Sequence, residues 1–204
     1  MTGEAPVSLA GRPDFEAIAA WVAPAATVLD LGCGDGLLLK FLAASRAVKG
    51  YGIEIADENV LACVARGVNV IQGDLERGLQ GFDAGSFDYV ILSQTLQAMR
   101  HTEAIVLEML RVGRQAIVTF PNFGHWQARW QVAFGGRMPV SRTLPYEWYD
   151  TPNVHLCTIR DFERFCATHS IRVLERLVLH AGERVSLLPN LLGSLAVFRF
   201  EKLH

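Results

Sequence analysis

Hydrophobic and polar residues follow two different rhythms along this chain, and the two rhythms take turns. Short runs rich in β-branched residues, typical of buried strands, are separated by stretches in which apolar residues recur every three or four positions, as in helices. This alternation predicts an α/β fold, doubly wound, with a mostly parallel sheet between two layers of helices. Strand-like runs occupy residues 26–31, 49–54, 68–72, 87–92, 115–120, 171–179 and 195–201.

One predicted helix is defined by its ends as well as by its apolar residues. Asp57 can accept hydrogen bonds from the free amides of a first helical turn, and Gly67 can end the helix. We expect Val60, Leu61 and Val64 to face the core from this helix. Further helices are predicted after Pro13 (Phe15, Ile18 and Val22 inward), at residues 37–44, from about Thr102 (Ile105, Leu107 and Met109 inward) and after a capping box of Thr158 and Asp161.

Residues 121–157 interrupt this rhythm with a loop-rich, aromatic stretch, which we interpret as an insertion in a single domain that spans residues 1–204. Residues 109–146 hold five arginines and no acid, and residues 121–149 hold three of the four tryptophans. Arginine and aromatic residues are typical of protein interfaces, but a lid over an aromatic ligand or a satellite core has the same composition. The candidates for partner or substrate contacts are Trp126, Arg129, Trp130, Arg137, Tyr146 and Trp148.

Composition narrows the class of protein. With 204 residues, 50% of them hydrophobic and 20% charged, the chain can bury a full core. A formal net charge of −2 gives no reason to expect nucleic-acid binding, and no apolar run reaches the roughly 20 residues that span a membrane. The start of the chain lacks a secretion signal, and the four cysteines show no metal-ligand spacing. We therefore expect a cytoplasmic protein with reduced thiols, no metal site, and neither nucleic acid nor membrane as partner.

The densest candidate chemistry follows the first strand, in the sequence VLDLGCGDG of residues 28–36. Glycines let the backbone approach a ligand closely, and the start of a helix offers free amides. Asp30 and Asp35 flank the loop, where carboxylates repel a pyrophosphate but attract the α-ammonium group of an amino acid. S-adenosylmethionine has that ammonium group and no phosphate, and the glycine spacing differs from that of NAD-binding loops. The pattern favours S-adenosylmethionine, or S-adenosyl-L-homocysteine, bound by Asp30, Gly32, Gly34 and Gly36.

Two further acids stand where the second and third strands end. Glu54 can accept hydrogen bonds from both ribose hydroxyls of a nucleoside. Asp74 can accept from the adenine amine, and a turn-forming aspartate is the alternative. Because the carboxyl ends of parallel strands meet at one edge, these acids are expected beside the glycine loop, where open α/β sheets bind ligands.

A polar cluster follows the fifth strand, in the sequence FPNFGHW of residues 120–126. Asn122 and His125 are candidates for positioning or deprotonating a substrate. A structural role for His125 in its loop is the alternative.

These motifs resemble those of the class I methyltransferases. VLDLGCGDG looks like the first motif of that family, YGIE like its second-strand acid, and QGDL like its adenine-contacting turn, which adds Leu75 to the binding residues. The resemblance implies a Rossmann-like sheet of seven strands with a reversed C-terminal hairpin. The sequence LSQTLQ at residues 92–97 departs from the Asn/Asp-Pro-Pro-aromatic turn of N-methylating relatives and lacks the histidine common in small-molecule methyltransferases.

Later motifs are more specific. LSQTLQ, FPNFGHW, RMPV with LPYEWY, and TPNVHLCTI together resemble the MetW family of methionine biosynthesis proteins, from about Phe15 onward. The resemblance implies a bacterial cytoplasmic protein that supports or regulates a homoserine O-acyltransferase of the MetX type, with a pocket of the S-adenosylmethionine type that could sense the end product of the pathway. Methyl transfer to a small molecule is the alternative function. The glycine spacing disfavours a dehydrogenase.

Overall fold

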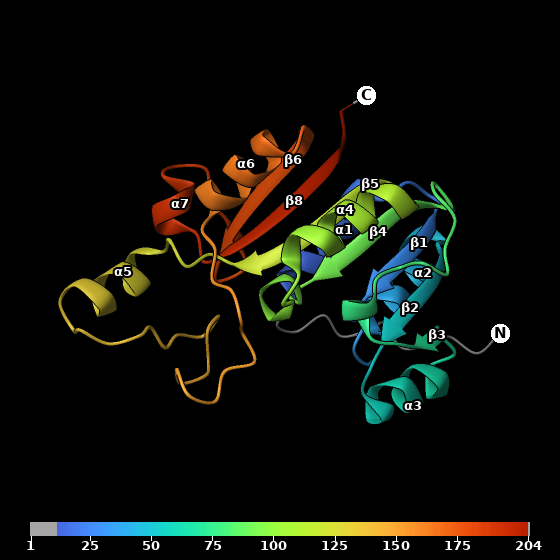
Figure 1. Cartoon of the computed structure of the whole chain (residues 1–204), viewed down its shortest axis with the longest axis horizontal. Coiled ribbons are helices and arrows are strands. Elements are labelled where there is room, and N and C mark those ends of the chain that lie inside the picture. Colours follow the sequence, from blue (N-terminus) through green and yellow to red (C-terminus); the bar gives the residue numbers. More distant parts are fainter. Residues whose placement is uncertain (1–11, 204) are drawn as a thin grey trace.

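The computed structural model describes residues 12–203, which form one sheet with the strand order β3-β2-β1-β4-β5-β8-β6-β7 (Figure 1). The first five strands are mutually parallel, as the alternating pattern predicts. Because β1 pairs in parallel with both β2 and β4, the carboxyl ends of these three strands lie at the same edge of the sheet. The parallel strands are β1 (Thr27–Leu31), β2 (Lys49–Glu54), β3 (Asn69–Gln72), β4 (Phe87–Ser93) and β5 (Gly113–Pro121).

The C-terminal strands reverse the direction of the sheet. β8 (Leu195–Lys202) lies antiparallel between β5 and β6 (Ile171–His180), which confirms the expected reversed hairpin. The sheet has eight strands rather than the expected seven. The additional strand is β7 (Glu183–Arg184), whose two residues pair with the end of β6. A strand of two residues is too short to leave a period in the sequence.

Helices cover both faces of the sheet, so the doubly wound prediction is confirmed. One core contains Ile105 and Met109 of α4 with Phe162 of α6, and the other contains Phe15 and Ile18 of α1 with residues of α2. Within residues 12–203, no helix is long and apolar enough to cross a membrane. The helices are α1 (Pro13–Trp21), α2 (Leu37–Arg46), α3 (Asp57–Ala65), α4 (Thr102–Val112), α5 (Trp126–Ala133), α6 (Ile159–Thr168) and α7 (Pro189–Leu192), with 3₁₀ turns η1 (Leu75–Arg77) and η2 (Leu96–Ala98).

The α3 helix corrects two expectations. Asp57 is its first residue rather than its cap, which is Ala56. Leu61 and Val64 are 69% and 63% exposed, whereas Cys63 is fully buried. The helix carries two neighbouring apolar stripes, and because it covers the edge strand β3, only the stripe with Cys63 meets the core.

A similar error affects one residue of α4. Leu107 is 42% exposed although Ile105 and Met109 are buried. Each helical residue turns the side chain by about 100°, so a residue two positions after Ile105 points to the opposite face. The capping box of Thr158 and Asp161 at the start of α6, in contrast, is confirmed in full.

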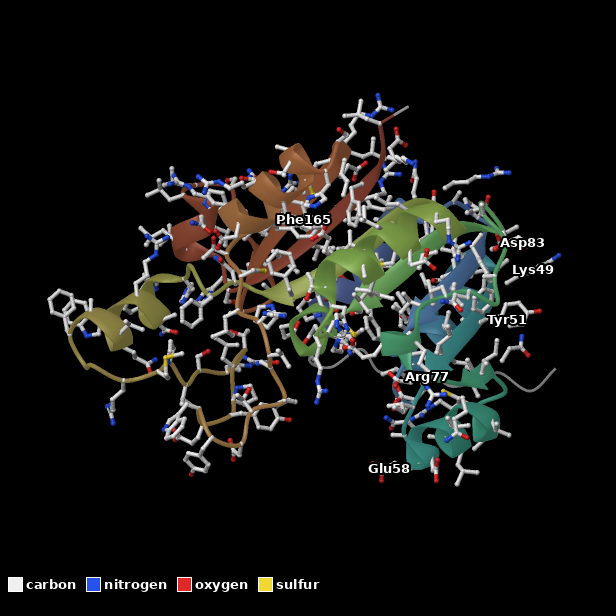
Figure 2. The ribbon with its side chains drawn as sticks, in the orientation of Figure 1. Lys49, Tyr51, Glu58, Arg77, Asp83 and Phe165 are labelled. Atoms are coloured by element: carbon white, nitrogen blue, oxygen red, sulfur yellow. The ribbon has the colours of Figure 1, made fainter. Side chains whose placement is uncertain are left out.

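Residues 122–158, which we call the α5 segment, extend away from the sheet (Figure 1). The segment contains α5 and long loops, and no strand. Ala128 is the only buried residue of α5. In Figure 2 the side chains along α5 and the loop after it stand out from the rest of the molecule.

Candidate functional site

The loop between β1 and α2 turns at three glycines with positive φ, at 65° for Gly32, 55° for Gly34 and 77° for Gly36. A Cβ atom at Gly32 would lie 2.9 Å from Oγ1 of Thr95, so the packing of the loop against the end of β4 requires glycine there. A Cβ atom at Gly34 would meet no described atom within 4 Å. The loop is therefore closely packed at its start and open at Gly34, where a ligand can approach the backbone.

Glu54, at the end of β2, holds this loop in place. Its Oε2 accepts a hydrogen bond from the Gly34 amide at 2.8 Å, and its Oε1 accepts from the amides of Ile55 and Ala56. The side chain is 7% exposed. A carboxylate has about four acceptor positions, so three backbone amides leave one for a ligand. From the sequence, Glu54 is expected to accept from both ribose hydroxyls. With one acceptor position left, the second hydroxyl would have to share a position with a backbone amide.

Asp30 is a buried acid of β1, next to the loop. It is 2% exposed, and its Oδ1 has no hydrogen-bond partner among the described residues. Burial raises the pKa of Asp30 from 3.8 to about 7; the guanidinium of Arg12 lowers it, and the carboxylates of Glu54 and Asp14 raise it further. A buried carboxyl oxygen without a hydrogen-bond partner is costly, and a ligand with an ammonium group would supply the missing donor.

The other sequence-predicted residues of this site have partners within the chain. The carboxylate of Asp35 lies 2.9 Å from Nη2 of Arg66 and also accepts from the amide of Leu37. Asp74 caps η1 by accepting from the Glu76 amide at 2.9 Å, the turn-forming role that was its alternative. Leu75 packs against the core on the α4 face. We call the group of Asp30, Gly32, Gly34, Gly36 and Glu54 the crevice; Asp74 and Leu75 follow β3 at the same edge of the sheet.

A buried ion pair beside the crevice was missed by the sequence analysis. Asp14 is fully buried and accepts two hydrogen bonds from Arg12, at 2.9 and 3.0 Å. The hydroxyl of Ser93, at the end of β4, lies 3.1 Å from the Asp14 carboxylate. A signal was present, since Asp14 is four residues before Ile18, on the face of α1 that enters the core.

A cavity of about 910 Å³ lies beside the crevice, between the carboxyl edge of the sheet and the α5 segment. Gln94 belongs to its lining, and the next residue, Thr95, packs against Gly32, so the cavity and the crevice adjoin. Its lining includes Glu16 of α1, Gln94 and Gln97 after β4, His125, Arg142 and Tyr146 of the α5 segment, and His180 of β6.

The two catalytic candidates differ in their contacts. The Asn122 amide nitrogen donates to the carbonyls of Gly193 and Asn190, and its oxygen accepts from the amides of Gly124 and Ile159, so the side chain fastens its loop. His125 faces the cavity. Its ring stacks on that of His180 at a centroid distance of 4.9 Å, and its Nε2 is buried with no partner in the described chain. Burial, followed by the nearby His180, lowers the pKa of His125.

The aromatic residues of the α5 segment are exposed. Trp126 and Trp130 lie four residues apart on α5, and they are 47% and 59% exposed. Tyr146 and Trp148 are 48% and 72% exposed. This exposure excludes the satellite-core interpretation for these four rings. Arg129 is fastened by a 2.6 Å bond to the carbonyl of Gly124, and Arg137 lines a shallow groove with Met138, Glu147 and Trp148.

Comparison with known proteins places this geometry in a family. A family model described as methionine biosynthesis protein MetW matches residues 12–200. The chain belongs to the MetW family. This MetW sequence is 37% identical over 202 residues to the bifunctional methionine biosynthesis protein MetXA/MetW of Rhodopirellula baltica. The alignment covers 93% of this chain and 32% of that protein, so the chain spans about a third of the length of this relative.

Solved structures show that the MetW fold is that of the class I methyltransferases. An S-adenosylmethionine dependent methyltransferase from Mesorhizobium loti has a TM-score of 0.69 at 16% identity, with 96% of this chain and 100% of that chain covered. A protein from Listeria monocytogenes described as a putative S-adenosylmethionine dependent methyltransferase also has a TM-score of 0.69. Its identity is 14%, with 94% of this chain and 99% of that chain covered. At these identities the likeness shows the fold alone.

Proposed function

We propose that this MetW protein binds S-adenosylmethionine or S-adenosyl-L-homocysteine in the crevice and acts as a partner of homoserine O-acyltransferase. The observation that carries the proposal is the juxtaposition of two features in a chain of the methionine biosynthesis family. A buried acid with one oxygen unpartnered in the described chain, Asp30, stands at the glycine loop, and the loop packs on the turn that lines the cavity beside the α5 segment, which carries exposed aromatic rings.

The residues of the crevice fit the nucleoside. Asp30 Oδ1 lacks a donor, and the α-ammonium group of S-adenosylmethionine is a charged donor. Glu54 has an acceptor position left for a ribose hydroxyl, and the backbone is open at Gly34. When bound, S-adenosylmethionine supplies a methyl group on a sulfonium centre. Asp74 accepts one backbone amide and keeps acceptor positions, so it is the proposed acceptor from the adenine amine, whereas Asp35 is paired with Arg66 and contributes charge near the loop.

The α5 segment is the proposed docking surface for the acyltransferase. The Rhodopirellula relative bears both names, MetXA and MetW, in one chain, and fusion is a common arrangement for proteins that work together. Exposed tryptophan, tyrosine and arginine side chains are the residues that dominate binding energy in protein interfaces. The segment supplies such residues in Trp126, Trp130, Arg137, Tyr146 and Trp148.

A ligand in the crevice can report to this surface only if it binds the free and the complexed protein with different affinity. The structure offers a route, because Gly32 packs on Thr95 and the neighbouring Gln94 lines the cavity that the α5 segment closes. We therefore propose that S-adenosylmethionine, an end product of the pathway, modulates the complex.

A pull-down of purified homoserine O-acyltransferase by this chain, across a titration of S-adenosylmethionine, tests the proposal. We expect a stable complex and a change of its affinity or of the acyltransferase activity as the nucleoside is added. Absence of a complex, together with unchanged acyltransferase activity, would refute the partnership. Nucleoside binding measured on the isolated chain tests the crevice separately.

Methyl transfer to a small molecule is the second candidate function. The cavity of about 910 Å³ beside the crevice favours it, since that volume suits a small acceptor. Formation of S-adenosyl-L-homocysteine with a candidate acceptor would support this function. Tight nucleoside binding without any turnover would favour the partner function instead.

A further inference from the structure

The cavity between the sheet edge and the α5 segment has two sides with different hydrogen-bonding character. One side is formed by α1 and the turn after β4, which are connected by the contact between Gln94 and Asp14. The other side is formed by the loop after β5 and the end of β6, which are connected by the stacked rings of His125 and His180. The α5 segment adds Arg142 to the lining.

The first side presents free acceptors, since the guanidinium of Arg12, which also lines it, is paired with Asp14. Gln97 donates its amide nitrogen to the carbonyl of Gln94 at 2.8 Å, which fixes the orientation of the side chain. Its Oε1 is then buried without a partner among the described residues. Glu16, on the same side, is exposed and has no described ion pair. A ligand at this side must therefore bring a donor, and a positive charge is the best complement of Glu16.

The second side presents donors. The Nε2 atom of His125 is buried with no partner in the described chain, and its stacking on His180 keeps the ring in place. Arg142 is an exposed guanidinium for which no ion pair occurs within residues 12–203. Imidazole N–H groups and a guanidinium are the usual partners of a carboxylate.

We propose that this cavity binds a free α-amino acid, with its carboxylate toward His125, His180 and Arg142 and its ammonium group toward Gln97 and Glu16. A simple anion would leave the Gln97 oxygen without a donor, and a simple cation would leave His125 and Arg142 without an acceptor. A zwitterion satisfies both sides at once. The inference deepens the second candidate function by naming the class of its small molecule, and it requires the cavity but no transfer of a methyl group.

Calorimetry with matched probes tests the class of ligand. The probes are the twenty standard L-amino acids and L-homoserine, each followed, if it binds, by the same molecule without its amino group and without its carboxylate. For L-homoserine these are 4-hydroxybutyrate and 3-aminopropan-1-ol. We expect at least one amino acid to bind, and both of its truncated forms to bind at least tenfold more weakly.

Two variants locate the site. His125→Phe keeps a ring for stacking on His180 but removes the nitrogen atoms, and Arg142→Ala removes an exposed charge with little effect on folding. Each should weaken binding of the amino acid at least fivefold, whereas the matched changes His101→Phe and Arg160→Ala, at residues that do not line the cavity, should not. Failure of every probe to bind, equal binding of the truncated forms, or unchanged binding by Arg142→Ala would overturn the inference.

The affinity for S-adenosyl-L-homocysteine, measured on the native chain and on Arg142→Ala, separates this inference from the proposed function. Arg142 lies outside the crevice, so nucleoside affinity should be the same in both proteins. Loss of nucleoside binding in the native chain with retained amino-acid binding would remove the crevice proposal and leave the cavity site standing. The reverse result would remove the cavity site alone.

Discussion

The crevice and the α5 segment differ in where their side chains make contacts. In the crevice, Asp30 and Glu54 are 2% and 7% exposed, and Glu54 accepts three backbone amides. On the α5 segment, Trp126 and Trp130 extend into solvent, and only Ala128 of α5 is buried. Functional groups built into the core cannot change without affecting the fold, whereas groups on a projecting segment can.

The most direct test of the difference between the two regions is the ion pair of Arg12 and Asp14 beside the crevice. We expect Asp14→Ala to lower the free energy of unfolding by about 3 kcal/mol, since it leaves Arg12 and the Ser93 hydroxyl without their buried acceptor. Arg12 is 35% exposed, which keeps the effect near the lower end for buried pairs. Equilibrium urea denaturation measures the loss.

Glu16→Ala is the matched control for this variant, because Glu16 lies on the exposed face of the same helical turn. Its effect should stay within about 0.5 kcal/mol. Equal losses in the two variants would show that the Asp14 pair is not part of the folded core.

The opposite behaviour is expected on the α5 segment. Replacing Trp126 and Trp130 together by alanine should weaken binding of the acyltransferase by at least about 2 kcal/mol, since exposed tryptophans are typical hot spots. Stability and nucleoside affinity should remain unchanged. Calorimetric titration with the partner, together with thermal melts, measures both quantities.

Leu61→Ala serves as the control for the tryptophans, because Leu61 is an exposed apolar residue on α3, at the other end of the sheet. It should leave partner binding intact. Unchanged partner binding in the tryptophan variant would remove α5 from the proposed docking surface.

Features that depend on residues near one another in the chain were predicted from the sequence, and contacts between distant residues were missed. The capping box of Thr158 and Asp161, the glycine loop and the strand-end position of Glu54 depend on neighbours in sequence, and all three lie where they were expected. The pairing of Asp14 with Ser93 and the stacking of His125 on His180 join distant parts of the chain, and no local pattern encodes them.

Ambiguous patterns account for the remaining differences. The α3 helix offers two apolar stripes, and only its place beside the edge strand decides that Cys63 rather than Leu61 is buried. For Asp74 the sequence offered a turn and an adenine contact; the structure shows the hydrogen bond of the turn, which leaves acceptor positions for the predicted adenine contact. The sequence carries the candidates, and the tertiary structure selects among them.

Within the crevice, Glu54 combines positioning of the loop with ligand contact. We expect Glu54→Ala to weaken S-adenosyl-L-homocysteine binding by about 2 kcal/mol, the contribution of hydrogen bonds to a charged group. Calorimetry measures the affinity. Glu54→Gln separates the two roles, because it keeps the shape of the side chain but places an amide nitrogen against the backbone donors. Unchanged affinity in the alanine variant would exclude Glu54 from the nucleoside site.

The smallest expected effect concerns the charge of Asp30. Its pKa of about 7 in the folded chain means that the free carboxyl binds a proton below pH 7, and a ligand ammonium group must displace that proton. Affinity for S-adenosylmethionine should therefore fall by about tenfold, or 1.4 kcal/mol, for each pH unit below 7. In the free protein the same raised pKa lowers stability as the pH rises from about 4 to about 7, since the folded state holds the proton that the unfolded state releases.

Calorimetry across this pH range, on the native chain and on Asp30→Asn, isolates the contribution of Asp30, since the variant removes its titration but keeps that of the ligand. The variant should lose most of the pH dependence and bind weakly at every pH. Asp35→Asn is the matched control, because Asp35 also flanks the loop but pairs with Arg66. If Asp35→Asn flattens the profile and Asp30→Asn does not, the ammonium group lies at the exposed acid, and the buried crevice loses the feature that distinguishes it from the α5 segment.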